Sequence, residues 1–181
     1  MKGRFSATME YIDKIGGTKT VVRRIILAVL LVVTFTFQNT GGLFPEPFGI
    51  NAIILIPATI CISMFEREFA GIFYGLAAGA MLDAFSAQSM ILNSLFFTCI
   101  GFLSGALITY LMRNNLLCAT IFVSVSSFVY TALVYFLYYA FNGADSPVYT
   151  YFRYFFPSMI YTILLTPLYY ILVRAISKKF K

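Results

Sequence analysis

The chain has 181 residues, of which 60% are hydrophobic and 11% are charged. An average soluble domain is about 45–50% apolar and roughly 25% charged, so a water-soluble fold could not cover this much apolar surface. The composition therefore indicates an all-α integral membrane protein with almost no soluble domain. The apolar runs, taken in chain order, predict about six transmembrane helices.

The N-terminal segment, residues 1–24, is polar and basic. Within it, Glu10–Ile15 is expected to form a short helical turn at the membrane surface. Gly16 and Gly17 follow directly and are expected to stop that turn. This segment is predicted to stay outside the bilayer.

The first apolar run follows Arg23 and Arg24 and covers residues 25–37. Extending it to Phe44 gives the roughly 20 residues that a helix needs to cross the hydrocarbon core. No small-residue cleavage site of the A-x-A kind follows, which disfavours a cleaved signal peptide. We therefore expect a retained transmembrane helix.

Five further runs are expected to be helices, at residues 50–65, 69–85, 90–112, 116–141 and 151–173. Pro57 lies inside the first of these and predicts a kink there. The charged triplet 66–68 separates the second helix from the third. The third and fourth helices are separated only by the polar residues 86–89, so they are expected to form a tight hairpin or a re-entrant pair.

Six spans place both termini on one side of the membrane. Of the 13 Lys and Arg residues, all but Arg153 fall on that side. Because cytoplasmic flanks are enriched in Lys and Arg, both termini are predicted to be cytoplasmic. The transmembrane domain then covers residues 25–173, and residues 174–181 form a basic cytoplasmic tail.

The side chains that common enzymes and metal sites require are scarce. The chain has no histidine, and Cys61, Cys99 and Cys118 lie in apolar runs without C-x-x-C spacing. Disulfides, zinc sites and Ser-His or Cys-His pairs are therefore not expected. The basic residues flank membrane segments, so nucleic acid is not an expected partner. We predict no catalytic, cofactor-binding or metal-binding residue.

The third and fourth predicted helices carry small residues at helical spacing. Gly71, Gly75 and Gly79 are four residues apart on the third helix, and Asp83 continues the same stripe. The fourth helix carries a matching stripe: Ser94, Thr98, Gly101, Gly105 and Thr109. Because small residues let membrane helices approach closely, the two stripes are expected to pack face to face. The candidate residues for helix packing or partner binding are Gly71, Gly75, Gly79, Asp83, Gly101 and Gly105.

Asp83 is the one acidic residue inside an apolar run. One interpretation is a proton or cation relay. The other is a helix-end residue that accepts hydrogen bonds from the turn at 86–89 and pairs with Arg153. The second is favoured, because a relay normally needs more than one titratable group within the membrane. A membrane enzyme is disfavoured because Asp83, Glu66 and Glu68 are expected at different depths.

The segment from Gly71 to Asp83, with glycines at every fourth position, is followed by a short Ser-containing turn and a helix with Gly101 and Gly105. This pattern resembles MreD, the rod shape-determining membrane protein, and the basic N-terminus, length and span count are similar to that family over nearly the whole chain. One departure is the turn 86–89, where many members have a glycine.

The resemblance implies a non-enzymatic scaffold in the bacterial plasma membrane that binds MreC. Its wider partners would be MreB, RodA and a class B penicillin-binding protein of the cell-wall elongation machinery, and no cofactor is implied. The implied fold is similar to that of the substrate-binding subunits of energy-coupling-factor vitamin transporters. Such a transporter subunit is the alternative function, although the first helix lacks the A-x-x-x-A patch of those subunits.

Overall fold

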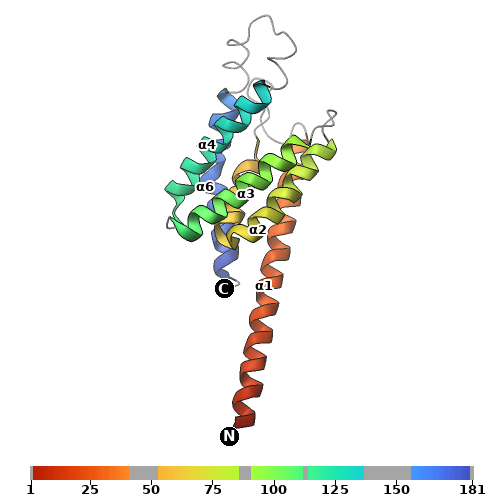
Figure 1. Ribbon diagram of the computed structural model, residues 1–181, viewed down its shortest axis with the longest axis vertical. Helices are drawn as coiled ribbons and strands as arrows, with labels where there is room; N and C mark the ends of the chain where they lie inside the picture. The colour runs from red at the N-terminus through yellow and green to blue at the C-terminus, as the bar shows by residue number, and fades with distance from the viewer. Residues whose placement is uncertain (1, 41–52, 86–90, 112–113, 137–155, 180–181) are drawn as a thin grey trace, which may run out of the picture.

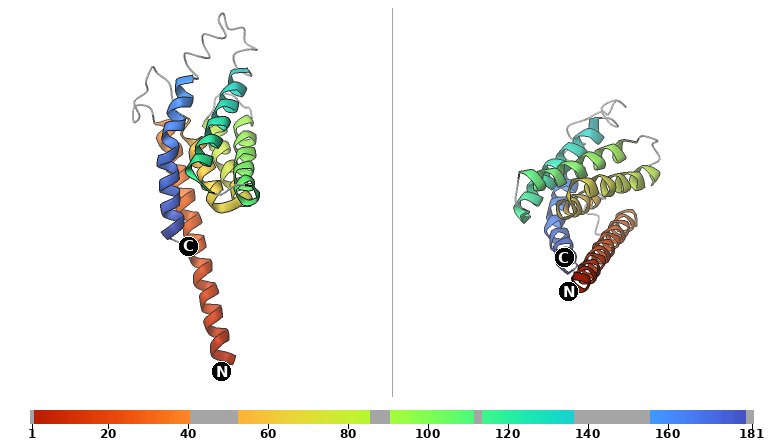
Figure 2. Two further views of the ribbon diagram at one scale, coloured as in Figure 1. Left: turned by 90° about the vertical axis from the view of Figure 1, so that its left-hand side faces the viewer. Right: turned by 60° about the horizontal axis from the view of Figure 1, so that its bottom comes forward.

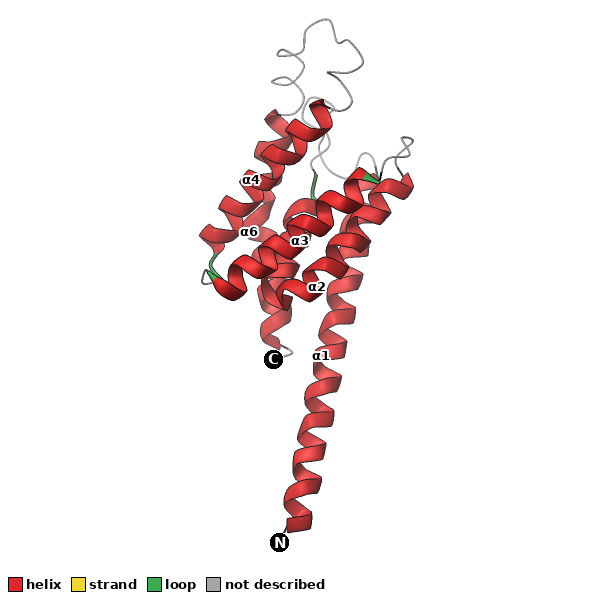
Figure 3. Ribbon diagram, viewed as in Figure 1, coloured by secondary structure: helices red, strands yellow, loops and turns green. Residues whose placement is uncertain are grey.

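The computed structural model describes residues 2–40, 53–85, 91–111, 114–136 and 156–179. These residues form five α-helices and no strand (Figures 1 and 3). The helices are α1 (Lys2–Asn39), α2 (Leu55–Phe85), α3 (Leu92–Tyr110), α4 (Leu116–Tyr135) and α6 (Phe156–Lys179). Each contains a stretch that is long and apolar enough to cross a membrane. The predicted all-helical class is confirmed, and the five apolar helices are compatible with a multi-pass membrane protein.

Helix α2 is broken into two halves at Arg67. This residue has φ 72° and ψ 177°, outside the helical region, while helical geometry continues on both sides. The first half therefore covers residues 55–66 and the second half covers residues 68–85. The break falls inside the charged triplet 66–68, where the sequence places the boundary between two helices.

The first half of α2 runs antiparallel to α1. At its start, the backbone N–H of Leu55 donates a hydrogen bond to Oε1 of Gln38, near the end of α1, at 2.9 Å. At its end, Glu66 forms an ion pair with Arg23, which lies about four helical turns earlier on α1. The chain thus returns along α1 toward the side from which α1 came.

The second half of α2 runs parallel to α1. Near its start, the hydroxyl of Tyr74 donates to the carbonyl oxygen of Arg24 at 2.9 Å. At its end, the ring of Phe85 packs against Phe35 with 5.2 Å between centroids. Arg67 is therefore a reversal point, and the described chain has six helical segments that alternate in direction. Accordingly, α1 begins and α6 ends at the same end of the bundle (Figures 1 and 2).

The first half of α2 is the centre of the hydrophobic core. Every residue from Leu55 to Met64 is buried. A helix that is apolar on nearly all sides lies inside a protein core or across a membrane, and here neighbouring helices cover every side of this segment. Its 12 residues span about 18 Å, shorter than the hydrocarbon core of a bilayer. The surrounding cluster adds side chains from α1, α3, α4 and α6: Leu27, Leu31, Phe35, Phe96, Phe97, Ile100, Ala119, Val123, Tyr170 and Val173.

Buried hydroxyl groups also line the interior of the bundle. Thr34, Thr59, Ser63, Thr131 and Thr162 each donate to the carbonyl oxygen four residues earlier on the same helix. This local bond satisfies a polar group that no water could reach. Large apolar side chains cover the outside instead, as expected where the solvent is lipid.

Two local predictions from the sequence are wrong. Pro57 does not kink α2, because it is the third residue of that helix, and first-turn N–H groups have no acceptor within their own helix. Gly16 and Gly17 do not stop a helix, because α1 continues through them. Glycine costs roughly 1 kcal/mol in a helix interior but does not block the hydrogen-bonding pattern as proline does.

The other boundaries differ by a few residues. The predicted first helix extends to Phe44, whereas α1 ends at Asn39, and residues 41–52 lie outside the described part. α2 begins at Leu55 rather than at residue 50. α6 reaches Lys179, past the expected end at residue 173. The proposed domain boundaries at residues 24 and 173 therefore fall inside α1 and α6.

Candidate functional site

The most extensive helix contact in the described chain is a seam between the second half of α2 and α3. At its centre, Gly71 faces Gly101. A Cβ on Gly71 would overlap the carbonyl group of Gly101, and a Cβ on Gly101 would overlap the carbonyl group of Gly71. The two backbones therefore touch directly, and no larger residue fits at either position without a shift of one helix.

The same contact repeats at the other glycines of both stripes. A Cβ on Gly75 would meet the carbonyl group of Phe97, and one on Gly79 would meet the backbone of Asn93 and Ser94. At the opposite end, a Cβ on Gly105 would lie 2.7 Å from both the Cα and the N of Glu68. The backbones of the two helices are in contact along the seam. The glycine faces of both helices are therefore occupied by each other and are not open to a third helix.

Asp83 closes one end of the seam by capping α3. Its Oδ2 accepts a hydrogen bond from the backbone N–H of Ser94 at 2.8 Å and another from the Ser94 hydroxyl, and its Oδ1 accepts from the N–H of Asn93 at 3.2 Å. Asn93 and Ser94 are the second and third residues of α3, whose N–H groups have no acceptor within the helix. A carboxylate at this position is also favoured by the helix dipole.

The capping geometry refines what the sequence indicates for Asp83. The sequence suggests a helix-end residue bonded to the turn 86–89 and paired with Arg153, and both of these lie outside the described residues. The donors that the structure describes come from the first turn of α3. Asp83 therefore joins α2 to α3 through three hydrogen bonds, in line with the seam.

The opposite end of the seam also has a polar contact. Oε2 of Glu68 accepts a hydrogen bond from the hydroxyl of Thr109 at 2.8 Å. The same hydroxyl lies 2.9 Å from the carbonyl oxygen of Gly105. The α2–α3 pair is therefore fixed by a carboxylate at each end and by glycine contacts between them.

A buried ionic cluster at the reversal point was not singled out from the sequence. Oε1 of Glu66 lies 2.5 Å from Nε of Arg23, and Oε2 lies 3.5 Å from Nε of Arg24. The Glu66 side chain is 1% exposed, whereas those of Arg23 and Arg24 are 19% and 59% exposed. Burying a carboxylate at a helix C-terminus is unfavourable unless cations neutralise it. The signal was available, because Arg23, Arg24 and Glu66 are all predicted at the same membrane face.

A second link that the sequence did not reveal joins α3 to α4. The hydroxyl of Tyr130 donates to Oδ1 of Asn93 at 2.8 Å. Its ring packs against Phe96 and Phe97, with centroid distances of 5.0 and 6.0 Å. Asn93 therefore connects Asp83 on one side to α4 on the other.

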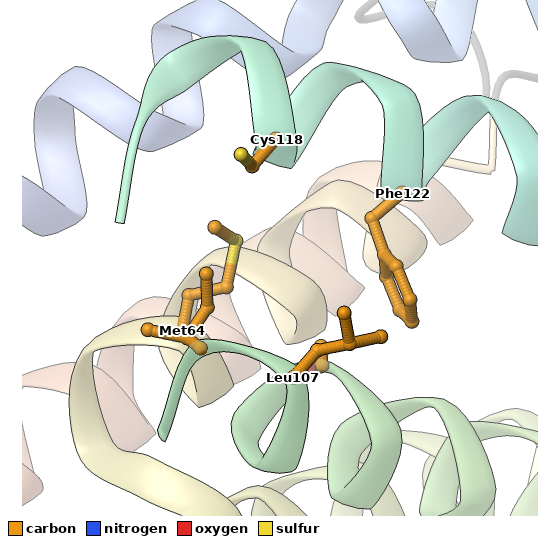
Figure 4. Close-up of a pocket in the computed structure, with 6 residues that line it drawn as sticks. Met64, Leu107, Cys118 and Phe122 are labelled. Carbon is orange, nitrogen blue, oxygen red and sulfur yellow. The ribbon is translucent and has the colours of Figure 1, made fainter. Parts of the chain in front are cut away.

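A small apolar cavity lies between α2, α3 and α4 (Figure 4). The side chains of Met64, Leu107, Cys118 and Phe122 converge on it from the three helices. Its volume is about 20 Å³. A pocket for a small-molecule ligand is usually 300–1,000 Å³, so this cavity could not accommodate a vitamin. No cluster of His, Cys, Asp and Glu suited to a metal ion occurs within the described ranges.

Comparison of the chain with models of known protein families, with curated proteins and with solved structures gives no match. The functional interpretation therefore rests on the residues and contacts described above.

Proposed function

We propose that the chain is a non-enzymatic, MreD-like scaffold of the bacterial cell-wall elongation machinery. In this role it would lie in the plasma membrane, bind an MreC-type membrane protein and support rod shape and peptidoglycan synthesis. RodA-type and penicillin-binding proteins would be the further members of the complex.

The observation that carries the proposal is that the residues behind the MreD resemblance form one structural unit. Gly71, Gly75, Gly79 and Asp83 all contact α3, and Gly101 and Gly105 contact α2 in return. A seam of backbone contacts, capped by Asp83, makes the α2–α3 pair a rigid body. A scaffold needs such a body in order to present a fixed outer surface to its partners.

The seam also limits where a partner helix would bind. Because the glycines of each stripe already face backbone atoms of the other helix, a partner would meet the outer surface of the α2–α3 pair. The seam would then act indirectly, by holding that outer surface in shape. Disturbing the seam should weaken partner binding even though no seam glycine touches the partner.

The proposed topology has six membrane crossings, both termini in the cytoplasm, and a fold similar to vitamin-transporter substrate-binding subunits. The reversal at Arg67 supports an even number of crossings. It divides α2 into two segments of opposite direction, so the five described helices give six segments.

Single cysteines at positions 6 and 179, in a variant without Cys61, Cys99 and Cys118, test on which side of the membrane the two termini lie. In whole cells both should resist a membrane-impermeant thiol reagent, and labelling of either would contradict the topology.

Co-purification tests the partner. The full-length protein and an MreC-type protein from the same genome are produced together and isolated in mild detergent. We expect a stable complex, weakened by Gly71→Leu and retained by Gly17→Leu, because Gly17 has no atom within 4 Å of its Cβ position. No association in detergent or in cells would overturn the proposal. Tight, saturable capture of a vitamin by the protein alone would favour the transporter alternative.

A further inference from the structure

Two arginines contact the buried carboxylate at the reversal point, and a third follows it in the chain. Arg23 and Arg24 both contact Glu66, and Arg67 is the next residue in the chain. Glu66 and Glu68 lie on either side of Arg67 and together balance two of these three positive charges. The cluster therefore keeps an excess of about one positive charge at one end of the bundle, so it is suited to bind an anion.

The guanidinium groups keep donors available for such an anion. Arg23 and Arg24 approach Glu66 through Nε, and each guanidinium has four further N–H donors on its terminal nitrogens. Among the described residues, Glu66 is the one carboxylate within ion-pair distance of either arginine. Arg24 is 59% exposed, so its free edge is accessible from outside the bundle.

Glu66 fixes where these donors lie. Its side chain is 1% exposed and is held on the central helix segment of the core. Two flexible arginine side chains that share one immobile carboxylate lose little further freedom when an anion binds. Preorganisation of this kind raises affinity without adding contacts.

The position along α1 indicates the source of the anion. Ile25, Val29 and Val33 are exposed at four-residue spacing and form an apolar stripe on the outside of α1, directly after Arg24 in the chain. Arg24 lies next to Ile25 on the same helix. A lipid whose acyl chains follow this stripe would place its phosphate at the level of Arg24, whereas free phosphate would gain nothing from the stripe.

We propose that Arg24 and Arg23, held by Glu66, form a site for the phosphate group of an anionic phospholipid. The site requires a membrane location and does not depend on the cell-shape role. A guanidinium fork binds phosphate oxygens bidentately, which a lysine ammonium cannot do.

Native mass spectrometry of the full-length protein tests this inference. The protein in detergent is titrated with phosphatidylglycerol or with phosphatidylcholine of the same acyl chains. We expect phosphatidylglycerol to bind more tightly. Arg24→Gln should weaken that preference about fivefold, the effect of one interfacial cation. Lys179→Gln, which removes the same charge from an exposed position at the end of α6, should change it less than twofold.

Two additional measurements separate this site from general electrostatic attraction. Arg24→Lys keeps the positive charge but loses the bidentate guanidinium group, so it should recover only part of the preference for phosphatidylglycerol over phosphatidylcholine. Equal losses in Arg24→Gln and Lys179→Gln, or full recovery in Arg24→Lys, would overturn the proposal. Displacement of phosphatidylglycerol by millimolar inorganic phosphate would also overturn it, because the site would then bind free anions.

Discussion

Gly71 and Gly101 occupy each other's side-chain space: the position of a Cβ on either residue is filled by the carbonyl group of the other. In water, apolar side chains would drive two helices together. In lipid that drive is absent, and close backbone packing takes its place. The contact therefore makes a specific prediction about stability.

Gly71→Ala should destabilise the protein by about 1–3 kcal/mol, the usual effect of forcing extra atoms into a packed interface. Gly17→Ala is the matched control. It adds the same methyl group to a helix where nothing lies within 4 Å, so no loss is expected. The buried Cys61 offers a direct measurement. With Cys99 and Cys118 replaced by serine, a thiol-reactive fluorogenic dye reports thermal unfolding through Cys61. Equal midpoints for the two variants would contradict the seam.

Asp83→Ala should cost about 1–2 kcal/mol, because it leaves the N–H groups of Asn93 and Ser94 without an acceptor. Asp83→Asn keeps one oxygen that can accept, so its loss should be smaller. Ser94→Ala removes the hydroxyl bond alone and should cost least. The same thermal assay measures all three.

The Asp83 variants also distinguish the cap from the relay. A cap predicts that partner binding falls in proportion to stability across the three variants. A relay would give a different pattern: Asp83→Asn would stay as stable as the wild type and yet lose biological activity. Complementation of rod shape, measured beside the unfolding midpoint, decides between the two.

Arg67→Gly should stabilise the protein by about 1 kcal/mol. Arg67 has φ 72° and ψ 177°, in a region that glycine adopts freely and that costs other residues on the order of 1–3 kcal/mol. The greater freedom of glycine in the unfolded chain offsets part of this gain. Arg67→Ala removes the same charge without relieving the backbone, so a gain in both variants would show that charge, and not conformation, is responsible.

Tyr130→Phe should cost about 0.6 kcal/mol, the average for hydrogen bonds between membrane helices. The substitution removes the bond to Asn93 and keeps the ring against Phe96. Tyr110→Phe is the control, since Tyr110 is exposed and its hydroxyl lies 3.5 Å from Glu68. A double-mutant cycle with Asn93→Leu should give a coupling energy of similar size, and no coupling would contradict the link.

Much of the helix arrangement could be predicted from the sequence because it depends on local pattern. The charged triplet 66–68 interrupts an apolar stretch, and the chain reverses there. The four-residue glycine spacing places one flat face on each of two helices. Since a short connection joins those helices, the sequence predicts that the two glycine faces pack against each other.

The other features depend on positions that local pattern does not contain. The effect of Pro57 depends on where α2 begins. An apolar run in the sequence does not show which of its residues makes the first hydrogen bond of the helix. Charged residues that end an apolar run are normally assigned to the membrane interface, so the sequence pattern does not predict the burial of Glu66. That burial depends on the ion pair with Arg23, which lies more than 40 positions earlier in the chain. The sequence suggests donors to Asp83 in the nearest turn, residues 86–89, whereas the described donors belong to the next helix.

The first half of α2 has a consequence for biosynthesis. It is among the earliest segments to leave the ribosome, yet the hydroxyl of Thr162, on the last helix, accepts the hydrogen bond from the N–H of Ile53 at 3.2 Å. At 12 residues and with Glu66 at its end, the segment is a poor candidate for insertion alone. We expect it to enter the bilayer together with the second half as a helical hairpin. Its enclosure is then complete only when α6 is added, so a chain that stops before residue 156 would leave its most deeply buried segment uncovered and open to membrane quality control.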